Sequence, residues 1–253
     1  MMPSLFLAHG SPMLALEDTL YTHFLSDLGG KLQPKAIVIF TAHWEKEVLT
    51  VSAIDQTYET IYDFYGFPPE LYEIKYPAKG SVSLAEKIQT LFADAGITAN
   101  LDTTRGLDHG SWTLLYKMYP QANIPVVQIS VHPFLEPEKQ YRIGKAMKEL
   151  SNEDVLIIGS GVTVHNLRII NWNQTEPEPW AVQFDDWLID KMEKQDLISL
   201  FQYEKLAPNA SLAVPRPEHF VPLFIAMGCG SNQPKTIFRS YELGTLSYLC
   251  MQF

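Results

Sequence analysis

Short apolar stretches rich in β-branched residues recur along the chain, and each is long enough for one strand. They are SLFLAH at 4–9, AIVIFTAH at 36–43, VLTVSAI at 48–54, IPVVQISV at 124–131 and DVLIIGSG at 154–161. Runs of this kind, apolar nearly throughout, are typical of strands that are covered on both faces. The pattern therefore predicts a buried sheet.

Stretches of helical length lie between most of these runs and carry apolar residues on one side. In SVSLAEKIQTLFADAG at 81–96, the apolar side consists of Leu84, Ile88, Leu91 and Phe92, and Gly96 follows where a helix usually ends. Strands that alternate with helices predict an α/β fold, with a central mostly parallel or mixed sheet flanked by helices. The proline-containing segment 173–180 indicates a loop rather than a linker, so we expect a single domain over residues 1–253.

Histidines stand at or just after the ends of several predicted strands. His9 and His43 end the first two runs, His132 follows the fourth, and His165 comes a few residues after the fifth. In such sheets ligands bind beyond the carboxyl ends of the strands. A single histidine is more often structural, but neutral imidazole is also a common ligand for divalent transition metals. The shared position of His9 and His43 therefore predicts a metal site at this edge of the sheet.

Another histidine follows an acidic residue in the segment GLDHGSW. Asp108 stands where the N-cap of the next helix is expected, and His109 is the first residue after it. The pair fits an ordinary helix start, and it equally fits a histidine at the rim of a pocket that donates a hydrogen bond to a bound molecule. The residues alone favour neither interpretation.

The segment PRPEHFVPLF presents the same choice nearer the C-terminus. Glu218 and His219 fit a metal ligand with its supporting carboxylate, and they also fit polar residues at the exposed start of a helix. By contrast, the glycines of IIGSG are a weak signal for phosphate binding, because the GxGxxG spacing and the Walker lysine are both missing. A tight turn that brings His165 towards a pocket explains them better.

Composition narrows the classes of partner. The 253 residues include 19 Lys and Arg against 29 Asp and Glu, a net charge of −10, which argues against nucleic acid as a partner. No signal peptide and no apolar segment of about 20 residues is visible, so we expect a cytoplasmic protein with no membrane partner. Cys229 and Cys250 lack CxxC spacing, and we expect buried thiols rather than a disulfide.

Eight motifs together resemble a known family. In chain order they are HGSPM (9–13), TAHW (41–44), YDFYGFPPELYEIKYPAKG (62–80), GLDHGSWTLLYKMYP (106–120), IPVVQISV (124–131), GSGVTVHNLR (159–168), PEHFVPL (217–223) and LGTLSYL (243–249). They resemble the DODA-type class III extradiol ring-cleavage dioxygenases, the group that includes the DOPA 4,5-dioxygenases. The resemblance covers nearly the whole chain and implies one catalytic α/β domain that opens the ring of a DOPA-like catechol with O2.

The resemblance also implies roles for individual residues. It makes His9, His43 and His219 ligands of one divalent metal ion per chain, with His219 chosen over the neighbouring glutamate by similarity to the DODA-type subgroup. It makes His165 the acid–base residue, with or without a contact to the metal, and His109 a second catalytic residue in the pocket. The expected substrate-binding residues are Tyr65, Phe67, His132 and Glu218.

The expected metal is Fe(II) for catalysis or Zn(II) in the protein as isolated. Three ligands on one side of Fe(II) leave positions for a catechol and O2, as in other non-haem iron oxygenases. If His165 joins the other three ligands, the four histidines also make a tetrahedral zinc site, and zinc does not change its oxidation state. The alternatives are therefore a zinc-binding hydrolase and a non-catalytic metal-binding relative of the same fold. The residues do not specify the oligomeric state.

Overall fold

A mixed sheet of eight strands organises the computed structural model, which describes residues 1–253. The strand order is β4-β3-β5-β2-β6-β1-β10-β7. The four central strands β5, β2, β6 and β1 are parallel, whereas β3 is antiparallel to β5, and β10 is antiparallel to both β1 and β7. The strands are β1 (Ser4–Ala8), β2 (Ala36–Glu45), β3 (Leu49–Ser52), β4 (Ala99–Asp102), β5 (Val126–Val131), β6 (Val155–Gly161), β7 (Lys235–Phe238) and β10 (Cys250–Gln252), with a small hairpin of β8 (Tyr241–Glu242) and β9 (Leu246–Ser247) beside them. The predicted α/β class with a mixed sheet is confirmed.

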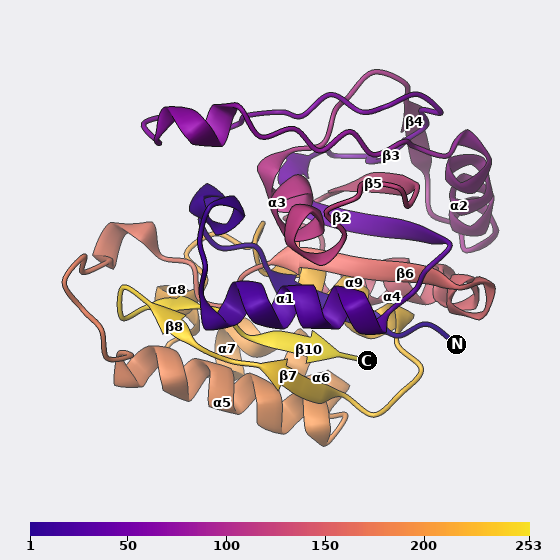
Figure 1. The fold of residues 1–253 in the computed structure, drawn as a ribbon. Coiled ribbons are helices and arrows are strands. Elements are labelled where there is room, and N and C mark those ends of the chain that lie inside the picture. Colours follow the sequence, from indigo (N-terminus) through magenta and orange to yellow (C-terminus); the bar gives the residue numbers. More distant parts are fainter.

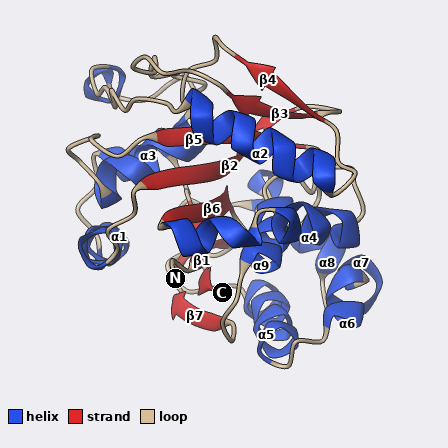
Figure 2. Ribbon diagram, turned by 90° about the vertical axis from the view of Figure 1, so that its right-hand side faces the viewer, coloured by secondary structure: helices blue, strands red, loops and turns tan.

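Helices cover both faces of this sheet, as Figure 2 shows. α1 and α3 lie on one face, and α2, α4, α5 and α9 lie on the other. The α-helices are α1 (Leu20–Lys31), α2 (Val82–Asp94), α3 (His109–Met118), α4 (Pro137–Ala146), α5 (Pro179–Glu193), α6 (Leu197–Phe201), α7 (Tyr203–Leu206), α8 (Ala210–Ala213) and α9 (Val221–Cys229). Short 3-10 turns are η1 (Pro12–Ala15), η2 (Pro69–Tyr72), η3 (Lys148–Glu153) and η4 (Leu167–Ile169).

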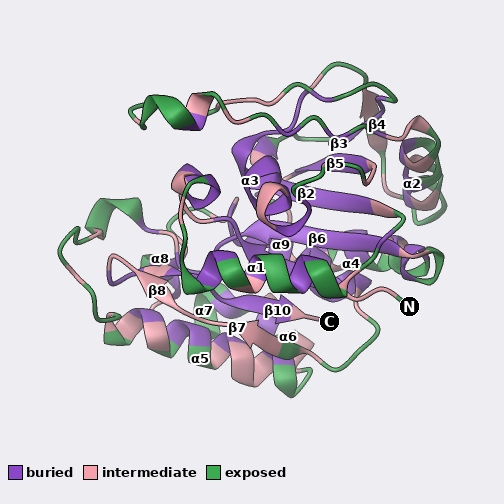
Figure 3. Ribbon diagram, viewed as in Figure 1, coloured by how far each residue is buried: buried purple, intermediate pink, exposed green.

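The central strands are buried on both faces because their apolar residues divide between the two helical layers. In β2, Ile37 and Ile39 pack towards α1 and α3, whereas Val38 and Phe40 pack towards α2, α4 and α9. The two-residue period of a strand produces this division. Figure 3 shows the resulting buried interior and the exposed outer sides of α1 and α2. An unbroken apolar run is thus the sequence pattern of a strand between two layers.

Local signals set the ends of these elements. Ser81 is the N-cap of α2, and its side chain accepts a hydrogen bond from the Leu84 amide; Gly96 follows the end of α2 with φ of +72°. None of the helices is both long and apolar enough to cross a membrane. Cys229 and Cys250 are buried, unpaired thiols.

The loops that follow the central parallel strands gather at one edge of the sheet, on the left in Figure 1. The turn after β1 contains η1, the segment between β3 and α2 contains η2, and the loop after β6 contains η4. The β8–β9 hairpin lies at the same edge. Segments far apart in the sequence therefore meet beyond the carboxyl ends of the parallel strands.

Candidate metal centre

Three histidines converge at this edge. His9 directly follows β1, His43 lies near the end of β2, and His219 lies just before α9. One ring nitrogen from each histidine falls in a group whose members all lie within 4.8 Å of one another. The Nε2 atoms of His9 and His43 are 3.0 Å apart. This spacing gives one ion access to all three rings.

A glycine in β6 allows the third histidine to come this close. A Cβ atom on Gly161 would lie 2.1 Å from the His219 carbonyl oxygen, so a larger residue would push the 217–220 segment away. The same carbonyl accepts a hydrogen bond of 2.8 Å from the Val162 amide. β6 therefore anchors the segment that carries His219.

The hydrogen bonds of His9 decide which of its ring nitrogens carries the proton. Its Nδ1 lies 2.9 Å from Ser160 Oγ, and the Ser160 hydroxyl donates its own hydrogen to the Gly110 carbonyl oxygen. Ser160 can therefore only accept from His9, which requires a proton on Nδ1. The lone pair of His9 Nε2 is then directed towards the other histidines, as a metal ligand requires.

His219 is held in the same tautomer by its neighbour in the sequence. Its Nδ1 lies 3.1 Å from Glu218 Oε1, and a carboxylate can only accept. Arg216 Nη1 lies 3.0 Å from the other oxygen of Glu218 and holds the carboxylate in place. The structure thus gives Glu218 a supporting contact to a ring nitrogen, and Glu218 does not line the cavity described below.

Burial keeps the converging rings neutral. It lowers the pKa of His9 and of His219 well below the usual histidine value, and the neighbouring imidazoles lower both further. The pKa of His43 is lowered mainly by burial as well, although the Asp63 charge opposes this. Neutral rings with free Nε2 lone pairs are the form of histidine that binds a transition metal, so these residues fit a divalent ion.

Two more histidines flank the three. The His165 ring stacks on the His219 ring with centroids 3.8 Å apart, and its nitrogens fall outside the group formed by His9, His43 and His219. Burial lowers the pKa of His165, against the opposing charge of Glu218. His109 opens α3, and its ring centroid lies 4.0 Å from that of His43.

Asp63 supports two of these rings and was not identified from the sequence. Its Oδ1 accepts a hydrogen bond from the His109 amide and lies 3.0 Å from His109 Nδ1, while its Oδ2 lies 3.5 Å from His43 Nδ1. Burial alone would raise the pKa of Asp63, but the contacts with both histidines outweigh it and lower this pKa. The carboxylate therefore stays charged and orients both rings.

Asp108 has the backbone position of an N-cap but uses its side chain elsewhere. Its carboxylate accepts from Thr41 Oγ1 at 2.7 Å and from Arg105 Nη2 at 3.1 Å, and it makes no capping hydrogen bond. Thr41 lies two residues before His43 in β2. Asp108 thus ties the start of α3, and with it His109, to the strand that carries His43.

A cavity of about 660 Å³ opens in front of the histidines. Its remaining lining is largely apolar and includes Phe64, Phe67 and Trp172. Its polar groups come from all five histidines, His9, His43, His109, His165 and His219, and from two glutamates and a few hydroxyl groups of the wall.

Besides Glu218, two more residues expected at the substrate lie outside the cavity. Tyr65 is 92% exposed and does not line the cavity, because neighbouring residues of this extended segment point to opposite sides and Phe64 takes the inner position. His132 lines a separate hollow with residues of α4 and of the chain after α2, on the other face of the sheet. Phe67 does line the cavity, as expected.

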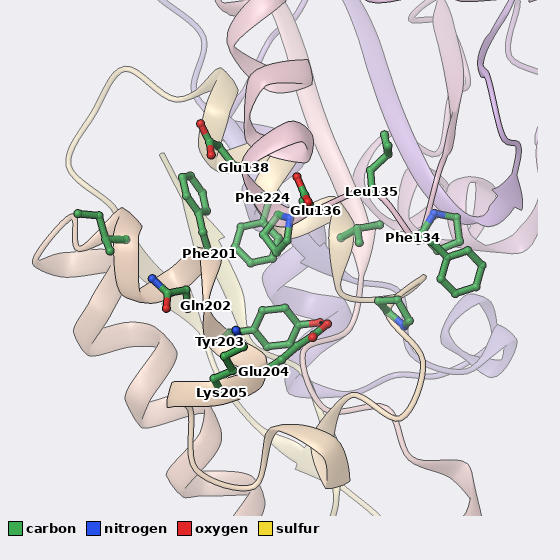
Figure 4. A pocket seen from close by; sticks show the side chains of 15 residues that line it. Phe134, Leu135, Glu136, Glu138, Phe201, Gln202, Tyr203, Glu204, Lys205 and Phe224 are labelled. Carbon is green, nitrogen blue, oxygen red and sulfur yellow. Dashed lines mark hydrogen bonds between the residues drawn. The ribbon is translucent and has the colours of Figure 1, made fainter.

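Another hollow of similar size, about 610 Å³, lies between the 133–138 segment and α6–α7 (Figure 4). Its lining includes Phe134, Phe201, Tyr203 and Phe224 but no histidine. None of the residues expected at the metal or the substrate borders it. Size alone therefore does not identify the functional cavity, whereas the imidazole cluster does.

Comparisons with known proteins identify the family of the chain. Residues 3–251 match the family described as the catalytic LigB subunit of aromatic ring-opening dioxygenase. The 4,5-DOPA dioxygenase extradiol of Beta vulgaris is 42% identical over 98% of this chain and 95% of that protein. The protein of the same name from Escherichia coli K12 is 39% identical over 99% of this chain and 94% of that protein. A crystal structure of an uncharacterized Escherichia coli K12 protein superposes with a TM-score of 0.86, at 36% identity and with both chains covered fully.

These similarities extend over nearly the whole chain. The expected extradiol ring-cleavage dioxygenase family is confirmed, and with it the dependence on a non-haem metal and the use of an aromatic substrate and O2. The chain belongs to the family of catalytic LigB subunits of aromatic ring-opening dioxygenases.

Proposed function

We propose that this protein is an extradiol dioxygenase that opens the ring of a DOPA-like catechol, with Fe(II) held by His9, His43 and His219. The observation that carries the proposal is the group of three buried, neutral imidazoles, two of which are fixed with Nε2 towards the others. When bound, Fe(II) supplies open coordination positions and a change of oxidation state for the reaction with O2. Zn(II) fits the same three ligands but is redox-inactive, so the zinc form has no dioxygenase activity.

The cavity binds and orients the ring. Phe64 and Phe67 lie with their rings perpendicular and their centroids 5.4 Å apart, and both line the wall next to His109. A flat aromatic substrate gains free energy from burial between such walls. The same walls exclude water and hold the two hydroxyl groups against the histidines.

His165 is the proposed general base. It lines the cavity beside the three ligands without joining them, and its lowered pKa leaves the ring neutral near pH 7. A neutral imidazole accepts a proton from a catechol hydroxyl and can return it later to a developing oxygen anion. The stacking on His219 fixes the plane of the ring while leaving its edge free for the proton.

His109 is the proposed hydrogen-bond donor on the opposite side. The Asp63 carboxylate lies 3.0 Å from its Nδ1 and can only accept there, so His109 donates into the cavity through Nε2 in its doubly protonated form, which the charged carboxylate stabilises. A donor fixed next to His43 stabilises negative charge as it develops on an oxygen of the bound molecules.

The experiment is anaerobic reconstitution with Fe(II), followed by addition of a panel of catechols and air. We expect oxygen uptake with a yellow ring-opened product in the iron form and none in the zinc form. His165→Ala should lower kcat by a factor of about 10² to 10⁴, the usual contribution of a general base. The matched control is His23→Ala, because His23 lies exposed on α1. If the iron-loaded protein consumes no oxygen with any catechol, the proposal is wrong.

A further inference from the structure

The outer wall of the metal cavity contains two carboxylates and no basic side chain. Glu17, two residues after η1, and Glu242 in β8 both line it, and no lysine or arginine does. We propose, resting on the function above, that Glu17 and Glu242 select catechols whose side chain carries an ammonium group over catechols whose only side-chain charge is a carboxylate. This assigns the charge class of the substrate.

Glu242 is held in place by Tyr248, which also contacts the turn that follows His9. The Tyr248 hydroxyl donates a hydrogen bond of 2.7 Å to Glu242 Oε2. The same hydroxyl lies against Gly10, the residue after His9, because a Cβ atom there would be 2.3 Å away. Gly10 also has φ of +57°, which glycine adopts without strain. The carboxylate of Glu242 is thus fixed on the His9 side of the cavity.

Glu17 lines the same wall as Glu242 and has no ion pair. It is partly buried, and burial together with the charge of Glu242 raises its pKa against the opposing charge of Lys117. Lys117 Nζ donates to the main-chain oxygen of Glu17 at 2.8 Å, and no ion pair joins it to the carboxylate. Two like charges beside an apolar wall repel each other, and a cation placed between them removes this repulsion.

The aromatic side chains of the same wall favour the same sign of charge. Tyr248, Trp172 and Phe64 line the cavity, and the faces of aromatic rings attract ammonium groups. A carboxylate without an ammonium group beside it would meet two glutamates and no lysine or arginine of the wall. The charges of the wall therefore favour a side chain with an ammonium group and disfavour one whose only charge is a carboxylate.

The test measures binding to the zinc-loaded protein, which does not turn the ligand over. The probes are dopamine, 4-methylcatechol and 3,4-dihydroxyphenylacetate, which are cationic, neutral and anionic near pH 7.5. We expect calorimetry to give the lowest Kd for dopamine and the highest for 3,4-dihydroxyphenylacetate. In the double variant Glu17→Gln with Glu242→Gln, the Kd ratio of 4-methylcatechol to dopamine should fall about tenfold, equivalent to about 1.4 kcal/mol.

Glu149→Gln is the matched control, because it removes one exposed carboxylate from η3, away from the cavity. It should leave the ratio unchanged. An equal ratio in the double variant and the wild type overturns the inference, even if the iron form consumes oxygen. Charge-dependent binding without oxygen uptake in the iron form supports the inference and refutes the proposed function instead.

Discussion

Replacing Ser160 by alanine tests whether the hydrogen bonds behind the histidines determine metal binding. Ser160 accepts from His9 Nδ1 at 2.9 Å, and His9 is 1% exposed, so no water reaches the nitrogen that loses its partner. An unsatisfied buried donor costs about 1–3 kcal/mol. The imidazole also loses the contact that keeps its proton on Nδ1, and losing such a contact typically weakens metal affinity about 10–100-fold. We therefore expect weaker zinc binding together with lower stability of the metal-free protein.

The assay is competition for Zn(II) against a chromophoric chelator, with urea unfolding of the metal-free protein beside it. Ser111→Ala is the matched control, because Ser111 is equally buried and its hydroxyl has no hydrogen-bond partner. It should change both quantities little. If Ser160→Ala binds zinc as tightly as the wild type, the proposed role of the Nδ1 contact is wrong.

Three further predictions concern the same edge of the sheet. Gly10→Ala should destabilise the protein by about 2 kcal/mol or more in urea unfolding, because left-handed backbone strain adds to the clash with the Tyr248 hydroxyl. Gly66→Ala is the control: Gly66 has φ of +80° with open space around it, so this change should destabilise the protein through backbone strain alone. Asp63→Asn should lower kcat about 10–100-fold in oxygen-uptake assays, and unchanged kcat would contradict its role. In the metal-free protein, the free energy of unfolding should fall by about 1.4 kcal/mol for each of His9 and His219 when the pH is lowered from about 7.5 to about 5.5, as urea unfolding measures. The reason is that these rings take up protons near pH 6.5 in the unfolded chain, whereas in the folded protein their lowered pKa keeps them neutral.

The central strands could be predicted from the sequence because each is covered on both faces. The runs at 36–43 and 154–161 correspond to β2 and β6 within two residues at each end. The edge strands β4 and β7 escaped prediction for the opposite reason. Lys235–Phe238 has no fully buried residue, so its sequence shows neither an apolar run nor a strict alternation. The position of β7 is set by its pairing with β10, and a local sequence pattern does not reveal which strands pair.

His9, His43 and His165 were visible in the sequence because they lie at or just after the ends of strands, and His109 and His219 received their roles from the family resemblance, whereas the residues behind the histidines were not visible. Asp63 lies in an extended segment with no regular period, and Ser160 is one of three small residues at the end of β6. Short polar residues of this kind are common in loops and strand ends, so nothing in their sequence context distinguishes them. The outward position of Tyr65 could not be predicted for a similar reason, since only the turn of the backbone decides whether Phe64 or Tyr65 faces inward.

Burying several imidazoles at one edge of a sheet imposes a condition on the residues around them. Each ring has two nitrogens, and where one faces the cavity the other must find a partner in the protein or remain an unsatisfied buried group. Ser160 and Glu218 meet this condition for His9 and His219, and the Asp63 carboxylate lies 3.5 Å from Nδ1 of His43. Because each partner also chooses the tautomer, a chain that kept the histidines but lost these partners would retain the ring positions without the directed lone pairs. Metal affinity should therefore depend on the supporting residues almost as strongly as on the histidines themselves.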